Sequence, residues 1–233
     1  MVGCGRKLGP YDCCTVVCGD CLQLMRELPD GCVDACITDP PYGIGYDASS
    51  SNQRGIQKFE MILGEESQFD ARFLLRFSDV ICWGANHYAH SLPQKEGQFY
   101  VWDKVLRNEL DVRIAECEFC WHKKGTKPRI FRHLWSGAYR DSEWGIRSLH
   151  PNQKPLALME WCIRQAGMPE TILDPFLGSG TTAVAAKKLG RHFLGFEISP
   201  EYCRIAEERI ALVEMQPQLF TPQPEQLPLN PEL

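Results

Sequence analysis

An acid followed by two prolines and a tyrosine, Asp39-Pro40-Pro41-Tyr42, stands where the apolar run VDACIT ends. In an open α/β sheet ligands bind at the carboxyl ends of strands, so this acid is placed for function. The two prolines fix an extended backbone and remove two N–H donors, which leaves carbonyls free to accept hydrogen bonds. Asp-Pro alone is common in turns after strands, but the full tetrapeptide in this position is much rarer.

The tetrapeptide offers what an amino group on a flat heterocycle needs in order to react. The carboxylate of Asp39 and the carbonyl of Pro40 can accept both N–H hydrogens, which draws the nitrogen toward tetrahedral geometry and frees its lone pair for attack. Tyr42 can stack on the ring and hold it in place. The candidate catalytic residues are therefore Asp39, Pro40, Pro41 and Tyr42.

A second motif, TILDPFLGSGTT at 171–182, predicts a strand that ends in an acid, a glycine-rich turn and the start of a helix. Gly178 and Gly180 remove side-chain bulk, so a ligand can approach the backbone closely. Glu197 follows about 20 residues past the glycines, where an acid can take both hydroxyls of a ribose. Alone, the turn suits a nicotinamide or flavin nucleotide equally well, although the GxGxxG form is absent. A phosphate-binding loop is disfavoured because Lys187 lies too far down the helix.

Seven short runs rich in β-branched or aromatic residues predict buried strands. Helical patterns lie between several of them, most clearly TTAVAAKKLG, which Gly190 ends, and SPEYCRIAEERIALV, which Ser199 can cap. Strands that alternate with helices predict an α/β fold, with a mostly parallel sheet and helices on both faces. The predicted strands are 14–18, 33–38, 80–83, 99–102, 114–121, 172–173 and 192–196.

The length of 233 residues, 44% of them hydrophobic, suffices for one sizeable core, so a single catalytic domain is expected, over 10–213. The proline-rich remainder, 214–233, is expected to be disordered. No run approaches the roughly 18 apolar residues that span a bilayer, and the first residues lack the apolar stretch of a secretory signal. A cytoplasmic protein without membrane association is expected.

Twelve cysteines fall largely within apolar runs, where a reduced thiol behaves as a small buried hydrophobe. Two CxxC pairs, Cys18 with Cys21 and Cys117 with Cys120, could be interpreted as a zinc site. The pairs lie roughly 95 residues apart, unlike the ligands of a zinc finger. The alternation of CEFCWH also sends Cys117 and Cys120 to opposite faces of a strand. No metal site is therefore expected.

The net charge of −5 argues against nucleic-acid binding until the charges are located along the chain. Between positions 123 and 147, seven basic residues accompany two acidic ones, and such a local patch can bind phosphates on an acidic molecule. A solvated basic loop is the alternative interpretation. The candidate nucleic-acid contacts are Lys123, Lys124, Lys127, Arg129, Arg132, Arg140 and Arg147.

Together these motifs resemble those of the DNA amino-methyltransferases, which modify N6 of adenine or N4 of cytosine. The tetrapeptide matches their catalytic motif, DPFLGSGTT at 174–182 matches their cofactor loop, and HPNQKP at 150–155 resembles the segment ahead of the cofactor strand. The resemblance covers roughly residues 15–212. Because the tetrapeptide precedes the cofactor loop, the order is that of the circularly permuted β class.

The resemblance implies a Rossmann-like, seven-stranded domain that uses S-adenosylmethionine for direct in-line methyl transfer to a flipped-out base in double-stranded DNA. It implies adenine N6 as the target, because Asp in the first position of the tetrapeptide usually accompanies adenine and Ser usually accompanies cytosine N4. Cytosine N4 is the main alternative. A methyltransferase of RNA or protein amides and a catalytically silent DNA-binding module are less favoured.

The resemblance also implies roles for single residues. Asp39 lies near the methionine end of the cofactor, Asp20 takes the amino group of its adenine, and Glu197 holds its ribose. From the sequence alone, Asp20 could equally be a helix cap. The candidate cofactor-binding residues are Asp20, Asp39, His150, Asn152, Lys154, Asp174, Phe176, Gly178, Ser179, Gly180, Thr181 and Glu197.

The resembling enzymes place their target-recognition region at 125–149 in this numbering, and here it is short. It mixes arginines with the aromatic residues Phe131, Trp135, Tyr139 and Trp144, a combination suited to phosphates and bases, although the aromatics could simply pack a small subdomain. A short region suggests that a second subunit supplies contacts, so a homodimer is expected. A cognate restriction endonuclease would be a second partner of such a prokaryotic or phage-encoded enzyme.

Overall fold

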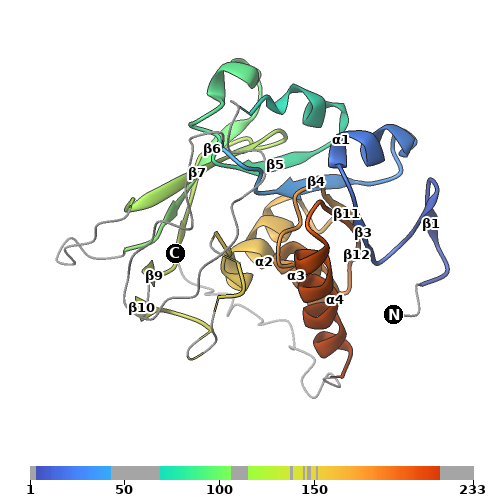
Figure 1. Ribbon diagram of the computed structural model, residues 1–233. Coiled ribbons are helices and arrows are strands. Elements are labelled where there is room, and N and C mark those ends of the chain that lie inside the picture. Colours follow the sequence, from blue (N-terminus) through green and yellow to red (C-terminus); the bar gives the residue numbers. More distant parts are fainter. Residues whose placement is uncertain are drawn as a thin grey trace, which may run out of the picture.

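The computed structural model describes residues 4–42, 69–105, 115–136, 139–143, 145, 148–150 and 152–215. Its main element is an eight-stranded sheet in the order β3-β12-β11-β4-β5-β7-β6-β8 (Figure 1). Only β7 pairs antiparallel to its neighbours, so the sheet is mostly parallel, as predicted. The strands are β3 (Thr15–Cys18), β4 (Ala35–Thr38), β5 (Val80–Trp83), β6 (Gln98–Asp103), β7 (Cys117–His122), β8 (Arg129–Arg132), β11 (Thr171–Asp174) and β12 (His192–Glu197).

All seven predicted strands form, but the predicted number of strands is wrong because β8 is an eighth. Its sequence RIFR pairs in parallel with β6, with Arg129 opposite Tyr100. Only Phe131 of this short edge strand packs against the core, while both arginines are exposed, so charge hides the strand pattern in the sequence. The first part of the expected recognition region therefore belongs to the main sheet.

Helices cover both faces of the sheet, as predicted (Figure 1). Successive strand residues point to opposite faces, so Ile81 and Trp83 pack in one core cluster and Val80 and Cys82 in the other. The first cluster lies under α2 (Leu156–Gln165), α3 (Thr181–Lys188) and α4 (Pro200–Met215). The second lies under α1 (Cys21–Leu24) and the 3-10 helices η1 (Met25–Glu27), η3 (Ala71–Arg76) and η4 (Ala89–Ser91).

Two small hairpins complete the fold, and helix α4 is the last described element. One hairpin joins β1 (Lys7–Leu8) to β2 (Tyr11–Asp12), and the other joins β9 (Trp135–Ser136) to β10 (Tyr139–Arg140). Ser199 caps α4 as predicted, since its hydroxyl accepts from the Tyr202 amide at 3.4 Å. The proline-rich positions 216–233 lie outside the described residues.

The strand order reverses between β11 and β4. From β11 the chain continues through α3 to β12 on one side, and from β4 it continues to β5 on the other. In doubly wound sheets such a switch point opens a crevice at the carboxyl ends of the strands, where ligands bind. No helix among the described residues is long and apolar enough to cross a membrane.

Candidate active site

Four acids lie in a row at the carboxyl ends of neighbouring parallel strands. Asp39 directly follows β4, Asp174 ends β11 and Glu197 ends β12. Asp20 follows β3, whose last residue, Cys18, is in register with Glu197. Three strand spacings of about 4.8 Å give the row a length of about 14 Å, a span suited to an extended nucleoside derivative. The structure therefore brings together the acids that the sequence placed at strand ends.

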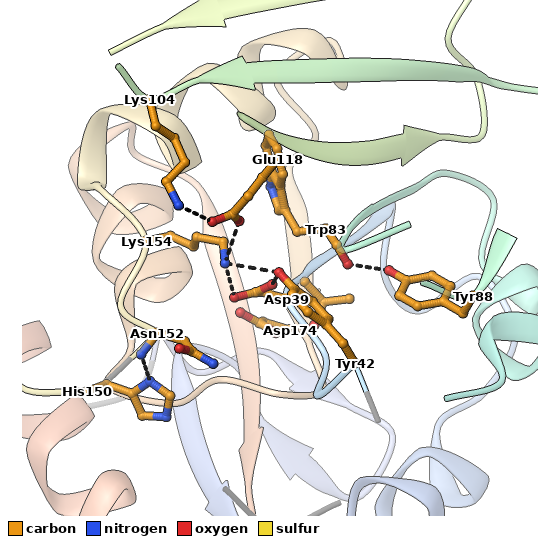
Figure 2. A network of polar contacts seen from close by, with 11 residues as sticks. Asp39, Tyr42, Trp83, Tyr88, Lys104, Glu118, His150, Asn152, Lys154 and Asp174 are labelled. Atoms are coloured by element: carbon orange, nitrogen blue, oxygen red, sulfur yellow. Dashed lines mark hydrogen bonds and ion pairs between the residues drawn. The ribbon is translucent and has the colours of Figure 1, made fainter. Parts of the chain in front are cut away.

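Asp39 and Tyr42 form one hydrogen-bonded unit with Lys154 (Figure 2). The Tyr42 hydroxyl donates to Oδ1 of Asp39 at 2.7 Å, and the Lys154 ammonium lies 2.7 Å from Oδ2. Lys154 also donates to the Tyr42 hydroxyl at 3.1 Å. A carboxylate oxygen carries two lone pairs, so each oxygen of Asp39 keeps a site at which it can accept a hydrogen from a substrate.

Lys154 also links Asp39 to a second ion pair that the sequence analysis missed. Its ammonium lies 3.0 Å from Oε2 of Glu118 on β7, and Oε1 of Glu118 accepts from Lys104 at 2.7 Å (Figure 2). The chain from Asp39 to Lys104 thus alternates acid and base. Glu118 interrupts the apolar strand CEFCWH, and this isolated charge was the one signal that could have revealed it.

The pKa values in this network follow from burial opposed by pairing. Burial raises the pKa of Asp39, while Lys154 counteracts that shift. Burial acts in the same direction on Glu118, but the ammonium groups of Lys154 and Lys104 outweigh it and lower its pKa to about 2. Burial alone would lower the pKa of Lys154, yet the two carboxylates raise it. Lys154 is therefore a fixed positive charge beside Asp39.

The ring of Tyr42 packs against the segment that follows β5. It stacks on the His87 ring, with centroids 5.1 Å apart and planes 16° apart. Gly84 has a φ of +74°, and a Cβ there would come within 2.0 Å of the Tyr42 ring, so only glycine permits this approach. His87 and Gly84 were not predicted, because nothing in the sequence indicates that they meet Tyr42.

The glycine-rich turn after β11 is held by Asp174 at its start and by Arg209 from outside. Oδ1 of Asp174 accepts from the Thr38 hydroxyl at 2.6 Å and from the Phe176 amide at 3.1 Å. Arg209 of α4 donates to the Ser179 carbonyl at 2.6 Å. Gly180 caps α3 with a φ of +86°. Hydrogen bonds from residues of β4, β11 and α4 thus hold the turn in place.

Glu197 touches this turn directly, whereas Asp20 serves its own helix. The Glu197 carboxylate accepts from the Gly178 amide at 2.8 Å and from the Ser199 amide at 2.9 Å. Burial raises the pKa of Glu197, and these amide donors oppose the shift. Asp20 caps α1, since Oδ1 accepts from the Leu22 amide at 2.9 Å. The helix-cap interpretation of Asp20 is thus realised, and its remaining oxygen is not engaged by that bond.

Residues of the tetrapeptide, of the segment 150–155 and of the glycine-rich turn line one pocket at the switch point. His150 packs over Gly178 and edge-on against Tyr202, and burial together with Lys154 lowers the pKa of His150 to about 4. Gln153, which the sequence analysis did not single out, accepts from the Leu149 amide at 2.9 Å. The pocket residues are Asp39, His150, Asn152, Gln153, Lys154, Met159, Asp174, Phe176, Leu177, Gly178, Ser179, Thr181 and Thr182.

The predicted basic residues differ in their surroundings. Lys123 donates to the carbonyls of Leu75 and Phe77, at 2.8 and 2.7 Å, and so is engaged within the fold. The guanidinium of Arg140 lies 4.2 Å from the centroid of the Trp135 ring. The exposed members are Lys124, Lys127, Arg129 and Arg132, while Arg147 lies outside the described residues.

Replacing Asp174 by asparagine is expected to stabilise the fold more at pH 8 than at pH 5. Burial raises the pKa of Asp174 from 3.8 to about 6, so the folded state holds an extra proton between these values and loses stability as the pH rises through them. Above that range the buried charge costs about 3 kcal/mol. Asparagine removes this cost and can still accept from Thr38.

Urea unfolding of both proteins at pH 5 and pH 8 measures this effect of Asp174. The gain in free energy of unfolding should be about 1.5 kcal/mol larger at pH 8. A gain that does not depend on pH would show that burial does not raise the pKa of Asp174.

Comparison with known proteins identifies a family and relatives that match this chain. A family model described as DNA methylase, for N6/N4 methyltransferases, matches residues 85–208, which is more than half of the chain. The type II methyltransferase M.HinfI of Haemophilus influenzae is 23% identical over an alignment of 251 positions, which covers 87% of this chain and 70% of that protein.

Solved structures of methyltransferases share the fold. The M1.HpyAVI–SAM complex superposes with a TM-score of 0.52 at 24% identity, covering 84% of this chain and 98% of the other. The cytosine-N4-specific PvuII DNA methyltransferase superposes with a TM-score of 0.54 at 18% identity, covering 83% and 85%. The expected Rossmann-like methyltransferase fold is confirmed.

Proposed function

Because the chain belongs to the N6/N4 DNA methylase family, we propose that it methylates the N6 amino group of adenine in double-stranded DNA. The observation that carries the proposal is the position of Asp39. Its carboxylate lies at the carboxyl end of β4, beside the pocket, and is held by Tyr42 and Lys154. An acid in this position can accept one hydrogen of an exocyclic amino group, and the Pro40 carbonyl can accept the other.

We propose S-adenosylmethionine as the methyl donor, bound along the row of strand-end acids. When bound, this cofactor supplies a methyl group on a positively charged sulfur. Asp174 would favour that charge, Glu197 would take ribose hydroxyls, and the backbone of Gly178 would lie against the ligand. The residues fit, since the Glu197 carboxylate accepts hydrogen bonds from the backbone amides of Gly178 in the turn and of Ser199, and it retains further acceptor capacity. The M1.HpyAVI–SAM complex, which shares the fold, supports this choice.

The residues of this chain would act by positioning and by accepting hydrogens. A base inside a duplex is out of reach, so the target must be flipped out at a cost of a few kcal/mol. Tyr42, whose ring stacks on His87 at one face, would stack on the flipped base. Direct transfer requires no thiol nucleophile, so the twelve cysteines stay outside the reaction.

Adenine is favoured over cytosine by one residue, the aspartate that opens the tetrapeptide. The fold is shared with a cytosine-N4-specific enzyme, so the fold does not discriminate between the bases. Expression in a host free of DNA methylation, followed by sequencing that maps modified bases, tests the proposal. N6-methyladenine at a recurring sequence is the expected result. N4-methylcytosine would refute the choice of base.

The class of substrate is tested separately with labelled cofactor. Incubation with DNA, RNA and protein should leave label in DNA alone. Label in RNA or protein would favour the alternative methyltransferase classes, and the absence of label from all three would favour a silent DNA-binding module. We further propose that Lys124, Lys127, Arg129 and Arg132 contact DNA, because they are exposed and basic. A homodimer and a cognate restriction endonuclease remain proposals.

Replacing Glu197 by alanine is expected to weaken cofactor binding by roughly 10- to 100-fold, because hydrogen bonds to charged groups contribute about 1.5–3 kcal/mol each. Calorimetric titration with S-adenosylmethionine measures this loss. The matched control is Glu201→Ala, which removes an exposed acid of the first turn of α4 and should leave the affinity unchanged. Equal affinities of the two variants would contradict the role of Glu197.

A further inference from the structure

Three thiols and one imidazole gather at the end of the sheet opposite the pocket. Cys4, Cys13 and Cys14 come from the N-terminal segment, and His192 begins β12, whose other end carries Glu197. One possible ligand atom of each of the four residues lies within 4.8 Å of those of the others. Figure 1 shows the N-terminal hairpin at the β3 edge of the sheet. The cluster therefore lies apart from the proposed chemistry.

The distances among Cys13, Cys14 and His192 are close to those of a tetrahedral metal site. With Zn–S bonds of about 2.3 Å and Zn–N bonds of about 2.0 Å, a tetrahedron has sulfur–sulfur edges of about 3.8 Å and sulfur–nitrogen edges of about 3.5 Å. The Sγ atoms of Cys13 and Cys14 are 3.7 Å apart, and they lie 3.3 and 3.5 Å from Nδ1 of His192. A sulfur–sulfur separation of 3.7 Å is far from the roughly 2.05 Å of a disulfide.

The backbone brings the two adjacent thiols together. Successive side chains of an extended chain point to opposite sides, but Cys14 has a φ of +63°, an uncommon conformation for a residue with a Cβ. This conformation turns both sulfur atoms toward His192. It is fixed by two hydrogen bonds, from the Cys13 amide to the Arg6 carbonyl at 2.9 Å and from the Cys14 amide to the Phe193 carbonyl at 2.7 Å. Strain of this kind persists where the surroundings impose it, which is often at ligand sites.

We propose that Cys4, Cys13, Cys14 and His192 bind one zinc ion that fixes the N-terminal segment to the sheet. Thiolate and imidazole ligands in tetrahedral arrangement select zinc over calcium or magnesium, and four protein ligands are typical of a structural rather than a catalytic site. Binding releases three thiol protons to solvent as the metal–sulfur bonds form.

This set differs from the CxxC pairs considered in the sequence. Cys18 lies on β3, at one edge of the sheet, whereas Cys117 and Cys120 lie on β7. Four strands separate β3 from β7. Those pairs therefore cannot share an ion. The spacing of Cys4, Cys13 and Cys14 gives no zinc-finger pattern, and His192 is distant in sequence, so only the fold brings the ligands together.

The test is the metal content of the full chain purified with a reductant and without chelator. Elemental analysis should find about one zinc per chain in the wild-type protein. Cys4→Ser removes an exposed ligand at little risk to the core and should lower the zinc content at least about fivefold. Cys32→Ser, which removes a partly buried thiol outside the cluster, is the matched control and should retain zinc.

A second measurement does not depend on how the variants fold. Titration of zinc-depleted wild-type protein with Co²⁺ should give thiolate-to-cobalt charge-transfer absorption that saturates at one equivalent and disappears on addition of zinc. Substoichiometric zinc together with no such absorption would overturn the proposal. Equal zinc contents in Cys4→Ser and Cys32→Ser would also overturn it. None of these readouts depends on methyl transfer, so they are independent of the proposed function.

Discussion

Asp39→Asn is expected to reduce methyl transfer by at least about 10³-fold while the affinity for S-adenosylmethionine changes by less than about threefold. The amide keeps the size of the side chain, but it loses the negative charge and replaces one acceptor oxygen by a donor, so it accepts a hydrogen of the substrate amino group less strongly. Loss of one preorganised electrostatic contact costs about 10²–10³ in rate, and here the substrate would also meet a donor. Single-turnover assays and calorimetry separate the two effects.

The control for this prediction is Asp30→Asn, an exposed acid paired with Arg76 far from the pocket, which should leave both quantities unchanged. The activity of the wild-type enzyme should also fall as the pH drops through the raised pKa of Asp39, because the protonated acid is a poor acceptor. More than about a tenth of the wild-type rate in Asp39→Asn would refute the role assigned to Asp39.

The part of the site that the sequence predicts is the part determined by strand ends. Asp39, Asp174 and Glu197 each follow an apolar run, and parallel strands bring such positions to one edge of a sheet. The apolar run 80–83 was predicted with the bounds that β5 has, and all four of its residues are buried. Strand and strand-end residues are local features, and local features can be inferred from a single sequence.

What the sequence does not predict depends on contacts between distant segments. Lys154 was expected near the cofactor, but its partner Glu118 on β7, which also pairs with Lys104, approaches it only once the sheet is folded. The thiols of Cys13 and Cys14 meet His192 because β12 pairs with β3. The strand β8 was missed for a different reason: two of its four residues are arginines, and its stability comes from pairing with β6 rather than from burial.

Lys154→Met is expected to destabilise the fold by about 3–5 kcal/mol, because removing one partner of a buried ion pair leaves an uncompensated charge. Both Asp39 and Glu118 would lose the ammonium that lies 2.7 and 3.0 Å from them. Their pKa values would rise, so methyl transfer should fall together with stability. Lys188→Met is the matched control, because this lysine pairs with Glu160 on the surface, is 47% exposed and should contribute less than about 1 kcal/mol.

A double variant distinguishes a structural from a functional role of Lys154. In Lys154→Met/Glu118→Gln the charges that remain in the network, Asp39 and Lys104, balance each other, so urea unfolding should show recovery of about half of the lost stability. Methyl transfer should not recover, because Asp39 still lacks the cation that opposes the burial-driven rise of its pKa. If activity returned with stability, Lys154 would act only by supporting the fold. If Lys154→Met were as stable as Lys188→Met, the alternating network from Asp39 to Lys104 would not hold this edge of the sheet.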